Sequence, residues 1–162
     1  MTDIIDQVRR ELITNSDETT KESGKRFFKE EVRLYGIKTV TVTRISRQAF
    51  KSIEKLSKEE IFDLCERLWA SGIMEEAFIA CDWSYAINKR YDEEDFPMLE
   101  RWVDTYVTNW ASCDTLCNHT IGTFLEMYPS FIEKMKDWTK SPNRWVRRAS
   151  AVSLIIPARK GL

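Results

Sequence analysis

The segment NWASCDTLCNH, residues 109–119, holds side chains that could do chemistry. Trp110 precedes Asp114 by four positions, and residues four apart on a helix project from the same face. A carboxylate fixed beside an aromatic ring can oppose positive charge that develops on a substrate. This geometry requires a helix that begins near Asn109, because an N-cap at Ser112 would leave Trp110 outside the helix.

A metal site is a second interpretation of the same segment. Cys113 and Cys117 are also four residues apart, and His119, the chain's single histidine, follows them. A structural zinc ion needs a fourth ligand and usually a tighter cysteine framework, and lone helical cysteines mostly pack as small apolar residues. A Cys–His nucleophile pair is equally poorly supported. We therefore expect no metal and no cofactor.

Overall composition and charge limit the class of protein. The 162 residues are 43% hydrophobic and 31% charged, which is typical of a folded protein, and the net charge of −1 argues against a generally basic nucleic-acid binder. The basic residues are nevertheless concentrated at one end, because six cations and no acid follow Asp137. Residues 1–137 therefore carry −7. The basic end could bind a polyanion or could simply be solvated.

The cysteine spacing and the lengths of the apolar runs indicate the cellular compartment of the protein. Cys65, Cys81, Cys113 and Cys117 have no disulfide-framework spacing. No apolar signal stretch opens the chain, and no run approaches the ~18 apolar residues of a membrane span. We expect a cytoplasmic protein, associated with the nucleoid if it binds DNA.

The scaffold that must position these residues is predicted to be helical. In SKEEIFDLCERLWASG, Ser57 and Glu60 form a capping box and Gly72 ends the helix. Between them the apolar residues recur at the spacing of one helix face: Ile61, Leu64, Cys65, Leu68 and Trp69.

Similar patterns predict helices along the rest of the chain, with Gly36 closing the second one and Pro157 interrupting the last. The expected ranges are about 2–15, 18–34, 39–54, 73–90, 94–107, 110–127, a helix opened by a Ser130/Glu133 capping box, and 143–156. Short loops between helices favour antiparallel pairs. We expect an all-α fold of antiparallel helix pairs stacked as a HEAT-like repeat solenoid with a concave face, with a helical bundle as the alternative.

Four segments together resemble a known family. They are LYGIKTVTVTRI (34–45), EEAFIACDWSYA (75–86), NWASCD (109–114) and SPNRWVRRASAVSLIIPARKG (141–161). In order and spacing they are similar to the DNA alkylation repair glycosylases built from HEAT-like repeats. The resemblance covers about residues 30–161.

The resemblance implies a reaction and the residues that perform it. Members of the family excise N3- and N7-alkylated purines from double-stranded DNA without a second lyase activity. By their positions, Trp110 and Asp114 correspond to active-site residues, and Arg148 to a contact with the DNA backbone beside the lesion. Arg147 and Arg144 are neighbours in the same basic patch. The arginines of this helix start have no acidic residue near them in the sequence.

One departure from the family concerns the C-terminal part. Family members usually continue for another repeat or more, which supplies a further active-site tryptophan. The sequence stops at Leu162, just after the helix of Arg148. We therefore expect residues 1–162 to form a single HEAT-like helical-repeat domain that is incomplete at its C-terminus relative to the family.

The chemistry expected of these residues is hydrolysis of an N-glycosidic bond. An alkylated purine is already cationic, so its departure needs no general acid, and Asp114 would oppose the positive charge that develops on the sugar. Without the resemblance, Asp114 fits an ordinary first-turn aspartate and Trp110 an interhelical core residue. The alternative function is a non-catalytic HEAT-like module that binds DNA or a protein partner.

Overall fold

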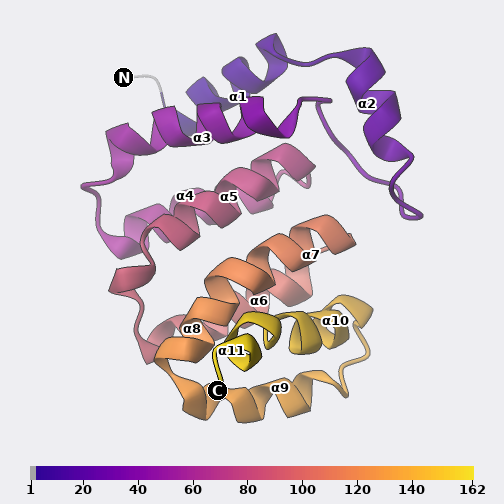
Figure 1. Cartoon of the computed structure of the whole chain (residues 1–162). Coiled ribbons are helices and arrows are strands. Elements are labelled where there is room, and N and C mark those ends of the chain that lie inside the picture. Colours follow the sequence, from indigo (N-terminus) through magenta and orange to yellow (C-terminus); the bar gives the residue numbers. More distant parts are fainter. Residues whose placement is uncertain (1–2) are drawn as a thin grey trace. The chain divides into compact units, whose positions relative to one another are not determined.

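The computed structural model describes residues 3–162, and Figure 1 shows the whole chain. The described residues form helices, joined by turns and a single isolated β-bridge between Arg33 and Ile73. The predicted all-α class is therefore confirmed. The chain divides into two compact units, Met1–Ser84 and Tyr85–Leu162, which are described one after the other. The expectation of a single continuous domain stays a prediction.

Unit 1 consists of helices, most of which bury residues in a shared core. The helices are α1 (Ile4–Thr14), α2 (Glu18–Lys25), α3 (Thr39–Ile53), α4 (Lys58–Trp69) and α5 (Met74–Ala86). Helix α1 packs against α3 and α4, and buries Ile5, Val8 and Leu12 completely. The indole nitrogen of Trp83 on α5 donates to the carbonyl of Ser46 on α3, 3.2 Å away. Burial of these apolar faces gives the unit its core.

Helix α4 begins and ends as its sequence predicts. The Ser57 hydroxyl accepts from the backbone N–H of Glu60, and the Glu60 carboxylate accepts from the backbone N–H of Ser57, so the capping box is formed. Gly72 follows the helix with φ +69°, a left-handed conformation that favours glycine.

The predicted helix over 18–34 is wrong in its second half, because α2 ends at Lys25. The chain beyond it forms a loop whose end is held by the buried carboxylate of Glu75 on α5. That carboxylate accepts the backbone N–H groups of Tyr35 (3.0 Å), Gly36 (2.9 Å) and Ile37 (3.3 Å). Gly36 has φ +88°, and a Cβ there would lie 2.5 Å from the carbonyl oxygen of Asp17. Tertiary contacts therefore override local helix propensity here.

A second buried carboxylate lies beside the first in α5. Glu76 accepts from Arg9 at Nε (3.2 Å) and Nη2 (3.0 Å), and from the Tyr35 hydroxyl at 2.7 Å. Burial raises the pKa of Tyr35, and the hydrogen bond to Glu76 raises it further. Three segments that are distant in sequence are thus tied together by one side chain that is almost fully buried.

Unit 2 is also built from packed helices. They are α6 (Phe96–Tyr106), α7 (Trp110–Leu116), α8 (Gly122–Met127), α9 (Ile132–Trp138), α10 (Arg144–Val152) and α11 (Ile155–Arg159), with short helical turns η1 (Asn88–Arg90), η2 (Glu93–Asp95), η3 (Cys117–Ile121) and η4 (Pro129–Phe131). Aromatic rings of α6, α8, η4 and α9 meet in the core. The ring centroid of Phe96 lies 4.9 Å from that of Phe131 and 5.7 Å from those of Phe124 and Trp138.

The helical path over 110–127 has the predicted bounds. It is continuous from Trp110 to Met127, but the middle turn, Cys117–Ile121, is wound as a π-helix, a feature that the sequence pattern does not predict. The helices predicted near 2–15, 39–54, 73–90 and 94–107 are confirmed to within a few residues at their ends, although position 2 lies outside the described residues.

Two predicted features near prolines are wrong. Pro129 opens a 3₁₀ turn that already contains Ser130, so Ser130 does not cap a helix, and α9 begins at Ile132 without a side-chain cap. The last predicted helix, 143–156, divides into α10 and α11, and Pro157 lies inside the first turn of α11. A proline is tolerated there because the N–H groups of the first turn have no intrahelical acceptor.

Candidate active site

The start of α7 fixes the position of Trp110. Asn109 is the N-cap, with φ −152° and ψ 164°, and its side-chain oxygen accepts the N–H of Ser112 at 2.9 Å. Trp110 is therefore the first residue of the helix, as the candidate geometry requires, and Ser112 is a buried interior residue. The indole of Trp110 is 42% exposed, so it is not an interhelical core residue.

Asp114 lies one turn further along α7 than Trp110. Ser112, Cys113 and Leu116 occupy the buried side of this helix. The Asp114 side chain is 27% exposed, so its carboxylate is neither sealed in the core nor fully solvated. The structure thus leaves an aromatic ring and a carboxylate accessible on one short helix.

Helix α10 brings Arg148 to this carboxylate. Arg148 Nε donates to Asp114 Oδ1 and Nη2 donates to Oδ2, each at 2.7 Å, which is a bidentate pair. The absence of an acidic neighbour in the sequence is therefore misleading, since the partner lies 34 positions earlier. The hydrogen bond to Asp114 raises the pKa of Arg148, so the guanidinium stays charged.

The Arg148 guanidinium keeps donors for a further ligand. A guanidinium carries five N–H groups, and the pair with Asp114 uses only those on one edge. Nη1 makes no hydrogen bond with any residue in the range 3–162, and the side chain is 43% exposed. An oxyanion at that free edge would contact Arg148 without breaking its pair with Asp114.

Asparagine caps hold the two helices of the site. Asn143 accepts the N–H of Trp145 at 2.9 Å, which starts α10, and donates through Nδ2 to the carbonyl (3.1 Å) and carboxylate (3.0 Å) of Asp104 on α6. The Cys113 thiol lies 3.7 Å from the carbonyl of Trp145 and connects α7 to α10. The positions of Asp114 and Arg148 therefore rest on caps and core contacts.

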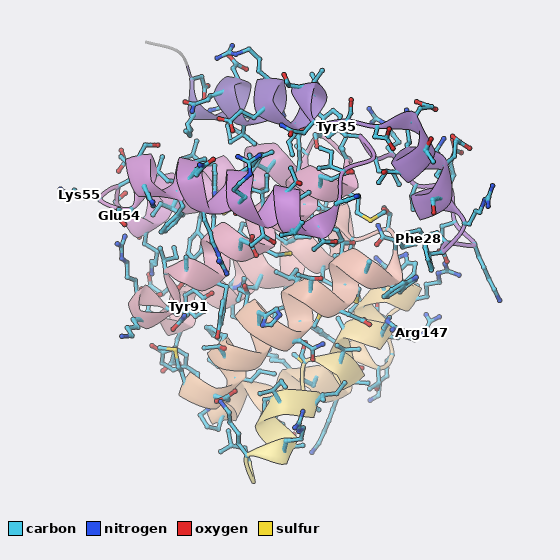
Figure 2. All side chains as sticks on the ribbon, turned by 45° about the horizontal axis from the view of Figure 1, so that its top comes forward. Phe28, Tyr35, Glu54, Lys55, Tyr91 and Arg147 are labelled. Atoms are coloured by element: carbon cyan, nitrogen blue, oxygen red, sulfur yellow. The ribbon has the colours of Figure 1, made fainter. Side chains whose placement is uncertain are left out.

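The other two candidate arginines are not held against Asp114. Arg147, labelled in Figure 2, donates through Nη1 to the carbonyls of Ser141 (2.7 Å) and Pro142 (3.0 Å). The Arg144 guanidinium lies over the ring of Trp145, 4.5 Å from its centroid. Trp145 is only partly buried. DNA contacts of Arg144 and Arg147 stay predictions.

The cysteines and the histidine of residues 109–119 differ in burial. The thiols of Cys113 and Cys117 are fully buried, whereas His119 is partly exposed and its ring centroid lies 5.3 Å from that of Tyr85. Within residues 3–162 there is no group of three His, Cys, Asp or Glu side chains that could hold a metal ion. Nor is any helix in that range both long and apolar enough to cross a bilayer.

A comparison with known protein families identifies the family of this chain. A family model described as DNA alkylation repair enzyme matches residues 8–162, and the chain belongs to that family. Its activity therefore lies in the repair of alkylated DNA, with DNA as the substrate. The comparison with curated proteins gave no match.

Proposed function

We propose that this protein hydrolyses the N-glycosidic bond of cationic N3- and N7-alkylated purines in double-stranded DNA. The observation that carries the proposal is the bidentate Arg148–Asp114 pair on an accessible surface one helical turn from the exposed indole of Trp110. Family membership supports it by giving the substrate as DNA and the damage as alkylation.

Asp114 opposes the charge that forms during the reaction. As the C1′–N bond breaks, its electron pair goes to the purine, whose positive charge is thereby neutralised, and the sugar becomes oxocarbenium-like. Water adds to C1′ and its proton passes to solvent or to the carboxylate. A fixed negative charge next to the sugar lowers the energy of this transition state, and removal of one such group typically costs about 10²–10³ in rate.

Trp110 and Arg148 select and position the substrate. The face of an exposed indole attracts a cation by about 0.5–2 kcal/mol, which favours the alkylated base over its neutral parent. The free edge of Arg148 suits a backbone phosphate, a contact that fixes register without reading sequence. The same side chain would then hold both the DNA and the catalytic carboxylate. No step requires a metal or an organic cofactor.

One observation favours a second candidate, a non-catalytic module that binds DNA or a protein. Both oxygens of Asp114 are already occupied by Arg148, so the carboxylate is charge-compensated before any ligand arrives. If that pair serves only to join α7 and α10, the surface around it binds without performing chemistry.

Release of free base separates the two candidates. The intact protein is incubated with duplexes that carry 7-methylguanine, 3-methyladenine or, as neutral lesions, hypoxanthine or uracil, and free base is measured by chromatography. We expect release of the two cationic bases and none of the neutral ones. Binding to all four duplexes without release from any would favour the module, and equal release of neutral and cationic bases would contradict selection by charge.

A further inference from the structure

Helix α3 of unit 1 carries a line of cations on its solvent face. Arg44, Arg47 and Lys51 are exposed and spaced three and four residues apart, so they lie on one side of the helix, and Lys55 follows just after it. Figure 2 shows Glu54 and Lys55 at this end of α3. We call Arg44, Arg47, Lys51 and Lys55 the α3 stripe. Its opposite face is the buried one, with Val42, Ile45, Ala49 and Ile53.

The α3 stripe is positively charged, whereas the rest of unit 1 carries a net negative charge. Residues 38–55 contain five cations and one anion, a net charge of +4, whereas the rest of residues 1–84 holds nine cations and fifteen anions, a net charge of −6. The exposed side of α4, by contrast, presents Glu59, Glu60 and Asp63. A basic helix in an otherwise acidic unit gives a local positive potential rather than a generally basic protein.

The cations of the α3 stripe are available to a partner. Among residues 3–162, none of the four forms an ion pair, and their only side-chain hydrogen bond joins Arg44 to Gln48 at 3.1 Å. Elsewhere in the unit exposed arginines are used within the fold, as where Arg67 pairs with Asp3. Four like charges without an ion-pair partner among the described residues cost the folded protein mutual repulsion, which a bound polyanion would relieve.

We propose that the α3 stripe binds the phosphate backbone of duplex DNA, independently of the site around Asp114. Arg44 and Lys51 are about 10 Å apart along the helix axis, a span over which duplex DNA presents several phosphates. A specific protein partner would instead need an aromatic or apolar centre, and the stripe has only Val40 at its start. This inference rests on the proposed function in one respect, which is that the partner is DNA.

Salt dependence of binding to undamaged duplex tests the stripe without requiring catalysis. The test variant of the full chain is Arg44→Gln, Arg47→Gln, Lys51→Gln, in which glutamine keeps helix propensity. The matched control is Arg10→Gln, Lys89→Gln, Lys134→Gln, which removes three exposed cations from α1, η1 and α9. Anisotropy titrations over a salt series give the slope of log Kd against log salt for both variants and the parent.

We expect the slope of the stripe variant to fall by about 2–3 relative to the parent, because each phosphate contact contributes about 0.9. The control should keep the parent's slope. Equal slopes in the stripe variant and the control would overturn the proposal, whether both fall or neither does. Loss of binding to polyglutamate but not to DNA would assign the stripe to an acidic protein and also overturn it. Absence of base release by the parent would count against the proposed function only, because this binding measurement involves no catalysis.

Discussion

Each unit contains an arginine–carboxylate pair that joins segments distant in sequence, and the two pairs differ in burial. The Glu76 side chain in unit 1 is 1% exposed and accepts from both Arg9 and the Tyr35 hydroxyl. The Asp114 side chain in unit 2 is 27% exposed, and its partner Arg148 keeps an unused edge. The two arginines are similarly exposed, at 36% for Arg9 and 43% for Arg148, so the pairs differ in their carboxylates: that of Glu76 is closed to a ligand and that of Asp114 is partly open. An arginine–carboxylate pair therefore stabilises the fold in unit 1, and in unit 2 it leaves an accessible carboxylate, to which the proposed function assigns a role in the reaction.

The largest expected effect comes from the buried pair. Glu76→Ala leaves Arg9 and the Tyr35 hydroxyl without their acceptor, and the loss of hydrogen bonds to a charged group typically costs about 1.5–3 kcal/mol. Urea denaturation followed by circular dichroism should show this loss in the free energy of unfolding. Asp114→Asn is the comparison variant, with an expected change of about 1 kcal/mol or less because its pair is partly exposed. Equal losses in the two variants would remove the distinction between the pairs.

Arg148→Lys tests whether the open pair positions its carboxylate. Lysine keeps the charge for a phosphate but cannot form the two-bond fork with Asp114. We expect the single-turnover rate of base release to fall about ten- to a hundredfold, while Kd for DNA changes little. Arg101→Lys on α6 is the matched control, with the parent's rate. A Kd effect without a rate effect would reduce Arg148 to a DNA contact.

The smallest expected effect is that of Glu60 on the melting temperature. Its carboxylate is exposed and caps a helix, so it adds a third environment to the comparison of Glu76 and Asp114. Hydrogen bonds from the Ser57 backbone lower the pKa of Glu60 below its ordinary value of 4.5. The capping box therefore stabilises the fold above that value and loses its contribution as the pH falls through the lower folded pKa. The melting temperature of Glu60→Gln should lie below the parent's at neutral pH and converge with it in acid. A constant difference across the pH range would contradict this assignment.

The sequence predicts what is encoded locally and fails where distant residues decide. The capping box at Ser57 is predicted correctly because its side chains and the backbone N–H groups that they accept from are neighbours in the sequence. The sequence leaves the next candidate N-cap open between Asn109 and Ser112, and the structure places it at Asn109. The loop that follows α2 is misread as helix because the Glu75 carboxylate that holds it lies about forty positions later. For the same reason the candidate residues Asp114 and Arg148 could be named, but their pairing could not be foreseen.

The α3 stripe shows a further limit of the sequence. The spacing of its four cations can be found in the sequence, but the net charge of the chain does not indicate it, and the basic C-terminal end is the more obvious cluster of cations. Only the helix bounds and the absence of ion pairs among the described residues separate it from an ordinary solvated face.

The single-turnover rate of 7-methylguanine release by Asp114→Asn, with DNA saturating, tests the account most directly. Asparagine keeps the shape of the side chain and removes its charge. The account predicts a rate about 10²–10³ below that of the parent, with DNA affinity retained and the free energy of unfolding nearly unchanged. A rate equal to the parent's would show that this carboxylate takes no part in the reaction, and would contradict the proposed site.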